Sequence, residues 1–364
     1  MDEKIIKVED LGYDEFFESN RLKLGLDIFQ IARVIAEHRG VYKVKNTEGE
    51  YLAKITGKHI FKASTREDYP AIGDWTVISK LEEKKAIIHN ILPRKTVMKR
   101  KYSGTNETQI IATNIEVAFV IESVDRDYNL NRFERYFAMA SDGGITPAIL
   151  LNKTDLISKE ELDSKLVQIK DRFKNMDVIP TSTVTDEGLD ELKRYIAKGK
   201  TYCFLGSSGV GKSSLINRLL GNSKIKIDEI GLHSGRGKHI TSAREMYFLE
   251  NGGIVIDNPG VREVGMTDTN TGIDSLFDEI IILAIKCKFG NCTHIQEPGC
   301  EVLSALKSGT LNQDKYSNYM SLKKETEYYE MTELEKKEKD RQFGKFINKV
   351  KKDLKNYNPK EYSE

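Results

Sequence analysis

The order of the nucleotide-binding motifs constrains this 364-residue chain more than any other feature. The segment Asn-Lys-Thr-Asp at residues 152–155 matches the motif with which GTPases recognise guanine, and residues 206–213 match a phosphate-binding P-loop. An ordinary GTPase has its P-loop first and its guanine motif later. Here the guanine motif precedes the P-loop, and an Asp-x-Pro-Gly segment at residues 257–260 follows both. The sequence therefore predicts a circularly permuted P-loop GTPase domain of the α/β class.

The P-loop segment has the residues and the surroundings that phosphate binding requires. Gly206, Gly209 and Gly211 allow the backbone to wrap phosphates with its N–H groups pointing inward. Lys212 would reach the β- and γ-phosphates, and the Ser213 hydroxyl would bind Mg²⁺. A buried strand is expected before the loop, and after it a helix whose N-terminus favours anions. Unless the segment is only a Gly/Ser-rich turn, the phosphate-binding residues are Gly206, Ser207, Ser208, Gly209, Val210, Gly211, Lys212, Ser213 and Ser214.

Base recognition is assigned to two loops. The Asp155 carboxylate can accept hydrogen bonds from both N1–H and the N2 amine of guanine, a donor pair that adenine lacks. Asn152 and Lys153 would brace the base and the P-loop. Residues 179–183 and 187–189 resemble the loop that offers a backbone N–H to guanine O6, which favours this interpretation over a plain polar loop. The predicted base-binding residues are Asn152, Lys153, Thr154, Asp155, Ser182 and Thr183.

The third motif lacks the side chain that usually orients the attacking water. Many GTPases have glutamine after the glycine of this motif, whereas this chain has Val261. We therefore predict His239 as the catalytic group, because it lies between the P-loop and Asp257, where the first switch belongs; the alternative is a solvated loop histidine. Thr241 is the predicted switch hydroxyl, with Ser242 as the alternative. The predicted magnesium ligands are Ser213, Thr241 and Asp257, and Gly260 completes the nucleotide-binding set.

Four residues near the C-terminal end of the chain predict a metal site: Cys287, Cys292, His294 and Cys300. Three thiolates and one imidazole match the tetrahedral coordination of structural Zn²⁺, although the spacing is not that of a common zinc finger. The alternative is a set of buried free cysteines. Because three of the four cysteines of the chain are in this cluster, we predict one structural zinc ion. Cys203, in the expected strand before the P-loop, is predicted to be a core residue.

These residues together resemble the RsgA/YjeQ family of circularly permuted GTPases, which depend on the small ribosomal subunit. The resemblance rests on the motif order, on Gly-Lys-His at residues 237–239 and, most specifically, on the Cys/His segment at residues 287–300. It implies an N-terminal OB-fold, the permuted GTPase domain and a C-terminal zinc-binding domain. It also implies hydrolysis of GTP to GDP and phosphate, with Mg²⁺ bound beside the GTP, stimulated by the 30S subunit during its late maturation. Ile240 stands where the family often has threonine, which leaves the choice between Thr241 and Ser242 open.

Length and composition set bounds on these expectations. A chain of 364 residues holds two or three domains. Its 57 basic and 56 acidic side chains give a net charge of +1, so contact with 16S rRNA has to rest on local patches. The sequence has no apolar stretch of about 18 residues and no apolar N-terminal signal region, so no membrane contact is expected. Few cysteines, mostly in a metal pattern, favour a cytoplasmic location, and we expect a monomer.

The pattern of strands, turns and charges predicts five segments. Residues 1–27 read as an N-terminal extension, 28–98 as the β-barrel, 99–113 as a linker, 114–270 as the permuted GTPase domain, and 271–364 as a helical zinc-binding domain with a basic tail. The basic runs at residues 94–101 and 341–352 are as consistent with RNA contact as with simple solvation. Since the permutation places Asp257 next to the zinc-binding domain, we expect that domain to shift relative to the barrel with the nucleotide state.

Two other functions stay open from the sequence. A P-loop kinase or ATPase with a zinc module would share the P-loop and the Cys/His cluster, but the guanine motif argues against it. A non-catalytic, nucleotide-gated RNA-binding protein would explain the missing switch glutamine.

Overall fold

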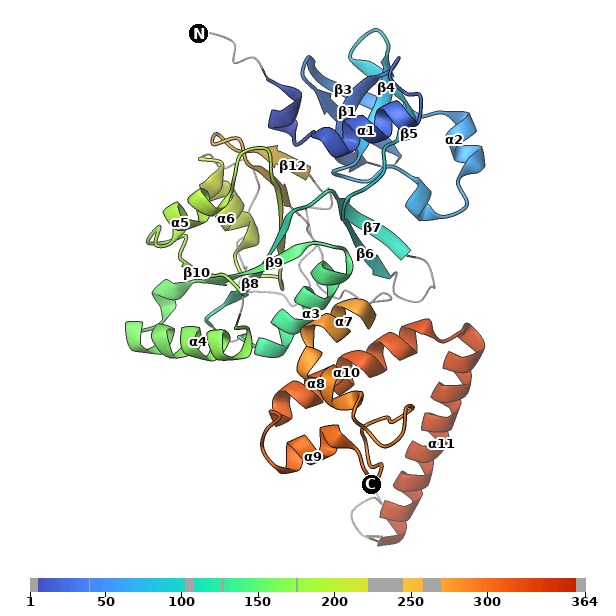
Figure 1. Cartoon of the computed structure of the whole chain (residues 1–364), viewed down its shortest axis with the longest axis vertical. Coiled ribbons are helices and arrows are strands. Elements are labelled where there is room, and N and C mark those ends of the chain that lie inside the picture. The colour runs from blue at the N-terminus through green and yellow to red at the C-terminus, as the bar shows by residue number, and fades with distance from the viewer. Residues whose placement is uncertain are drawn as a thin grey trace.

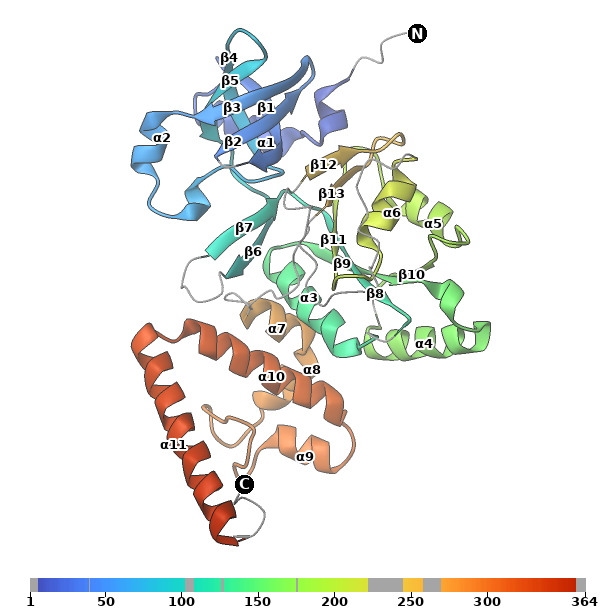
Figure 2. The same ribbon diagram turned by 180° about the vertical axis from the view of Figure 1, so that it is seen from behind.

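The computed structural model describes residues 6–38, 40–101, 108–125, 128–174, 176–221, 245–257 and 270–357. Three units follow one another along the chain: a small barrel, a sheet covered by helices, and a helical unit (Figure 1 and, from behind, Figure 2). This order confirms the predicted fold class. The predicted residues His239, Thr241, Ser242 and Gly260 lie outside the described residues, as does Val261. No helix in the described ranges is long and apolar enough to span a membrane.

Five strands close the N-terminal barrel. β1 pairs with both β2 and β4, so the strand order β1-β2-β3-β5-β4 returns to its start. Alternate side chains such as Ala32, Val34 and Val44 are fully buried in its interior. Gly40 has a φ of 78°, and this left-handed turn connects β1 to β2. The elements are β1 (Gln30–His38), β2 (Val41–Asn46), β3 (Gly49–Ile55), α2 (Gly57–Lys62), η2 (Arg66–Asp68), β4 (Trp75–Lys80) and β5 (Lys85–Ile91).

The segment before the barrel, predicted as an extension, packs against it. It forms η1 (Val8–Leu11) and α1 (Glu15–Lys23). Leu11 and Phe17 are 1% exposed and share a buried cluster with Trp75 of β4. This segment therefore contributes to the core of the barrel unit.

The segment predicted as a linker is also folded. β6 (Val97–Lys101) and β7 (Thr108–Thr113) pair in an antiparallel, two-stranded sheet between the barrel and the central unit. The domain limits given above remain predictions.

The central unit is built on a mostly parallel sheet. Its strand order is β10-β9-β8-β11-β13-β12, and only β12 runs antiparallel to its neighbour. Helices cover both faces, with α3 and α4 on one side and α5 and α6 on the other. The two strands that carry the guanine motif and the P-loop, β9 and β11, flank β8, so both motifs lie at the same edge of the sheet. The elements are β8 (Val117–Ser123), α3 (Leu130–Asp142), β9 (Thr146–Asn152), η3 (Thr154–Leu156), α4 (Lys159–Arg172), β10 (Val178–Thr181), α5 (Leu189–Tyr195), β11 (Thr201–Leu205), α6 (Lys212–Leu219), β12 (Glu245–Phe248) and β13 (Ile254–Asp257).

The C-terminal unit is helical and is attached to the central unit through α3. A Cβ atom at Gly272 of α7 would lie 2.1 Å from the carbonyl oxygen of Ala138 in α3, so only glycine allows this close helix contact. Arg135 of α3 also donates a hydrogen bond of 2.9 Å to Glu325 of α10. The long helix α11 continues from the end of α10 along the outside of the unit (Figure 1). The helices are α7 (Asn270–Leu276), α8 (Asp278–Ala284), α9 (Glu301–Lys307), α10 (Gln313–Glu330) and α11 (Glu333–Tyr357).

A buried arginine joins the barrel to the central sheet. The Arg33 side chain of β1 donates hydrogen bonds to the carbonyls of Leu11 (2.7 Å), Gly73 (3.3 Å) and Asn114 (3.1 Å) and to the hydroxyl of Thr201 (2.8 Å). Its residue exposure is 1%, and burial lowers its pKa to about 10. β1 also pairs with β12, so the barrel and the central sheet form one continuous eleven-stranded sheet. The two units are therefore joined by both backbone and side-chain hydrogen bonds.

Substitution of Arg33 by lysine is expected to lower the free energy of unfolding by about 2–3 kcal/mol. Lysine keeps the charge but cannot supply the planar fork of donors, so buried acceptors lose their partners. Urea unfolding followed by the fluorescence of Trp75, the single tryptophan of the chain, measures this directly. The same exchange at the exposed residue Arg194 serves as the control. An unchanged urea midpoint for Arg33→Lys would show that the junction between the barrel and the central sheet does not depend on the guanidinium.

Candidate nucleotide and metal sites

The P-loop connects β11 to α6 and has the backbone that phosphate binding requires. Gly206, Gly209 and Gly211 have φ values of 150°, 83° and 99°, which favour glycine. A Cβ atom at Gly206 would lie 2.3 Å from the carbonyl oxygen of Ile121 in β8, so a larger residue would push the loop away from the sheet. The Lys212 ammonium lies within the loop, where it donates hydrogen bonds of 2.7 Å to the carbonyls of Gly206 and Ser207.

The guanine motif is attached to the P-loop through one buried amide. Asn152 is 1% exposed, donates a 2.7 Å hydrogen bond to the Val210 carbonyl and accepts one of 3.0 Å from the Thr181 hydroxyl. A Cβ atom at Gly211 would lie 2.3 Å from the same amide nitrogen. The motif and the P-loop are therefore in contact in spite of their inverted order.

The residues predicted to read the base form one hydrogen-bonded group. The Ser182 hydroxyl donates a 2.5 Å hydrogen bond to Asp155 and accepts hydrogen bonds from the N–H groups of Val184 and Thr185. The Thr154 hydroxyl donates to the Thr181 carbonyl at 3.2 Å. These contacts bring the two predicted base-recognition loops together and hold the Asp155 carboxylate between them.

Two residues of this region were not predicted from the sequence. Arg218 of α6 donates hydrogen bonds of 2.9 and 3.2 Å to the carbonyl of Thr183, which fixes the second recognition loop. Asp125 lies after β8 and binds the ammonium of Lys153 at 2.8 Å. An acidic residue two positions after a buried strand was a usable signal for Asp125, whereas nothing in the sequence marks Arg218.

The carboxylate at the end of β13 is placed near the P-loop. Asp257 is 6% exposed and lies on the strand next to β11. Burial raises the pKa of its carboxyl above the usual range, and the positive charge of Lys212 opposes this shift. A buried carboxylate close to the P-loop lysine has the donor chemistry that Mg²⁺ prefers. Ser213, the other described residue predicted to bind magnesium, lies in the first turn of α6.

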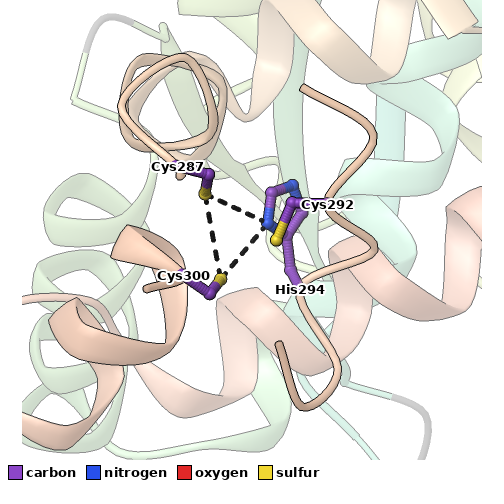
Figure 3. A group of neighbouring side chains, drawn as sticks. All are labelled: Cys287, Cys292, His294 and Cys300. Carbon is purple, nitrogen blue, oxygen red and sulfur yellow. Dashed lines mark hydrogen bonds between the residues drawn. The ribbon is translucent and has the colours of Figure 1, made fainter. Parts of the chain in front are cut away.

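The four predicted metal-site residues meet in the helical unit. One ligand atom from each of Cys287, Cys292, His294 and Cys300 lies within 4.8 Å of the others (Figure 3). Cys287 follows α8, Cys300 is the N-cap of α9, and the other two come from the loop between them. His294 has a left-handed φ of 60°, and its carbonyl accepts a 2.6 Å hydrogen bond from Tyr316 of α10. Burial lowers the pKa of His294, which favours the neutral imidazole that binds metal.

The arrangement of these atoms can hold a metal ion. Nδ1 of His294 lies 3.4 Å from Sγ of Cys300 and 3.7 Å from Sγ of Cys287, and the two sulfur atoms are 3.9 Å apart.

Cys203, by contrast, is fully buried in β11, and desolvation raises its pKa, as expected of a core thiol.

Comparison with known proteins identifies the family. The family model described as RsgA GTPase matches residues 91–267. The small ribosomal subunit biogenesis GTPase RsgA 2 of Lactiplantibacillus plantarum is 40% identical over 318 residues, which are 86% of this chain and 89% of the relative. RsgA 1 of Bacteroides thetaiotaomicron is 36% identical over 348 residues, 94% of this chain and 96% of the relative. The chain belongs to the RsgA GTPase family.

Solved structures support the fold independently. The crystal structure of YjeQ from Thermotoga maritima matches with a TM-score of 0.61 at 24% identity. The match covers 82% of this chain and 99% of the YjeQ chain. The structure of YloQ, described as a circularly permuted GTPase, matches with a TM-score of 0.58 at 21% identity. That match covers 84% of this chain and 97% of the YloQ chain. Both matches cover more than four-fifths of this chain.

Proposed function

We propose that this chain is a GTP hydrolase that binds the small ribosomal subunit and acts in its late maturation, with turnover stimulated by the subunit. The contact of Asn152 with the Val210 carbonyl carries the proposal, because it joins a guanine motif to a P-loop. The names of the two relatives, small ribosomal subunit biogenesis GTPases, supply the biological setting. Contact with 16S rRNA, a monomeric state and a cytoplasmic location belong to the same proposal.

Each described residue of the site has a separate role in this function. Asp155 accepts the two guanine donors, and Lys212 neutralises charge on the β- and γ-phosphates. The Ser213 hydroxyl and the Asp257 carboxylate would hold Mg²⁺, which when bound neutralises phosphate charge. His239 and Thr241, from the segment between α6 and β12, would supply the catalytic group and a further magnesium ligand.

Zinc is the metal that the Cys/His cluster fits best. Zinc bonds of about 2.3 Å to sulfur and about 2.0 Å to nitrogen, arranged as a tetrahedron, would give S–S edges of roughly 3.8 Å and S–N edges of roughly 3.5 Å. The observed separations of 3.9, 3.7 and 3.4 Å agree with these edges. Because four protein ligands leave no open position, the ion would be structural.

The decisive experiment is single-turnover hydrolysis of GTP, and of ATP as the competing substrate, with and without purified 30S subunits. We expect slow hydrolysis of GTP alone, strong stimulation by 30S subunits, and no binding of ATP. Co-sedimentation with 30S subunits should be stronger with a GTP analogue than with GDP. Equal use of ATP would favour the P-loop kinase or ATPase alternative. Subunit binding without any hydrolysis would favour a nucleotide-gated RNA-binding protein.

Substitution of Asp155 by asparagine is expected to weaken GTP binding by about ten- to a hundredfold and to create affinity for XTP. Loss of one charge-assisted hydrogen bond is worth roughly 1.5–3 kcal/mol, and the new amide can donate to the extra carbonyl of xanthine. Titration with fluorescent GTP and XTP analogues measures both effects. The control is Asp190→Asn, at a 92% exposed carboxylate on α5. Unchanged GTP affinity without any gain for XTP would exclude Asp155 as the base reader.

A further inference from the structure

Lys153 of the guanine motif has a constrained backbone and a paired side chain. Its φ of 64° is left-handed, and its neighbours Asn152 and Thr154 are 1% and 4% exposed, each with hydrogen bonds to the surrounding loops. The direction in which the Lys153 side chain leaves the backbone is therefore set. Its ammonium makes a 2.8 Å ion pair with the carboxylate of Asp125, and the two side chains are 28% and 31% exposed.

Asp125 is itself held in place by β8. Ser123 is 1% exposed. Its hydroxyl donates a 2.6 Å hydrogen bond to Oδ1 of Asp125, whereas Lys153 binds Oδ2. The N–H of Val124 donates a 3.0 Å hydrogen bond to the carbonyl of Asn152. The turn after β8 is thus attached to the guanine motif by the Val124–Asn152 hydrogen bond as well as by the ion pair.

We propose that Asp125 is a positioning residue that orders Lys153 for guanine nucleotide binding. This inference rests on the proposed function only in taking residues 152–155 as the base-binding motif. A lysine side chain without a partner samples many rotamers, and this conformational entropy would be lost when the nucleotide binds. A lysine already paired with a fixed carboxylate avoids most of that loss. Asp125 therefore acts through Lys153 and has no contact of its own with the base.

The test is a double-mutant cycle on nucleotide affinity. Asp125→Asn, which keeps the size of the side chain and removes its charge, is expected to weaken GDP and GTP binding about three- to tenfold, mainly through faster dissociation. Ser123→Ala should have a smaller effect in the same direction. In a Lys153→Met background, Asp125→Asn should have no further effect, because the residue it positions is gone. Asp125→Glu should recover part of the affinity.

A matched control variant and the wild type distinguish failure of the positioning role from failure of the proposed function. Asp177→Asn removes a carboxylate that is bonded to Tyr195. Asp177 precedes β10, and it is the other end of that strand that pairs with Asn152, so this variant should keep the wild-type affinity. Full affinity of Asp125→Asn, or an equal loss in the Lys153→Met background, would overturn the positioning role while leaving the proposed function intact. A wild-type protein that binds no guanine nucleotide would overturn both.

Discussion

Substitution of Cys300 by serine is expected to abolish the proposed binding of zinc and to unfold the region around α8 and α9. Cys300 is 5% exposed, its sulfur is the N-cap of α9, and it lies within ligand distance of both His294 and Cys287. Apparent binding free energies of structural zinc are about 10–16 kcal/mol near neutral pH, and this free energy contributes to folding. Loss of one ligand thus affects the whole loop between α8 and α9.

Metal content and thermal unfolding measure this result together. The wild type should contain one zinc ion per chain and should lose thermal stability when a strong chelator is added. Cys203→Ala is the matched control, because it removes the thiol outside the cluster and should leave the zinc content unchanged. GDP affinity of Cys300→Ser should stay within a few-fold, since the residues proposed to bind the nucleotide belong to the central unit. Purified wild type without zinc, with its three cluster thiols reacting freely, would remove the metal site.

Substitution of His239 by alanine is expected to slow the 30S-stimulated hydrolysis of GTP by about 10²- to 10⁴-fold. The reason is chemical: Val261 cannot orient water, whereas Lys212, the lysine predicted to bind phosphate, and the buried Asp257 carboxylate are both present. Phosphoryl transfer depends mainly on positioning and charge stabilisation, so one polar side chain in the first switch can supply the missing function. Single-turnover rates with saturating 30S subunits provide the measurement.

The segment between α6 and β12 offers its own control for this substitution. His233 lies in the same segment, and His233→Ala should keep the stimulated rate. Nucleotide affinity of His239→Ala should change no more than a few-fold, because Lys212, Asn152 and Asp155 remain. A variant that binds 30S subunits and turns over like the wild type would assign the catalytic group to the ribosome instead.

The parts of the site that depend on local sequence were predictable. The glycines of the P-loop, the contact between the two base-recognition loops and the grouping of three cysteines with His294 all follow from motifs whose chemistry requires those residue types. The contacts that were not predicted join residues far apart in sequence. Arg218 and Thr183 are an example, since a helix arginine has no local feature that identifies its acceptor.

The limits of the strands were less predictable than their existence. The left-handed turn at Gly40 separates β1 from β2, and β6 and β7 occupy much of the segment predicted as a linker. Basic residues masked the strand pattern there, because Lys99, Arg100 and Lys101 of β6 look like a solvated charge run. The expected shift of the zinc-binding unit with the nucleotide state stays a prediction.

The junction at Arg33 has a consequence for the order in which the chain folds. Two of its four acceptors, at Leu11 and Gly73, are available as soon as the barrel has been synthesised, but Thr201 belongs to β11. In an unpermuted domain β11 would be the first strand made; here it follows β8, β9 and β10. Contacts between residues so distant in sequence form slowly, because the intervening chain must first be ordered. Docking of the barrel is therefore completed late in folding, together with the strand that carries the P-loop.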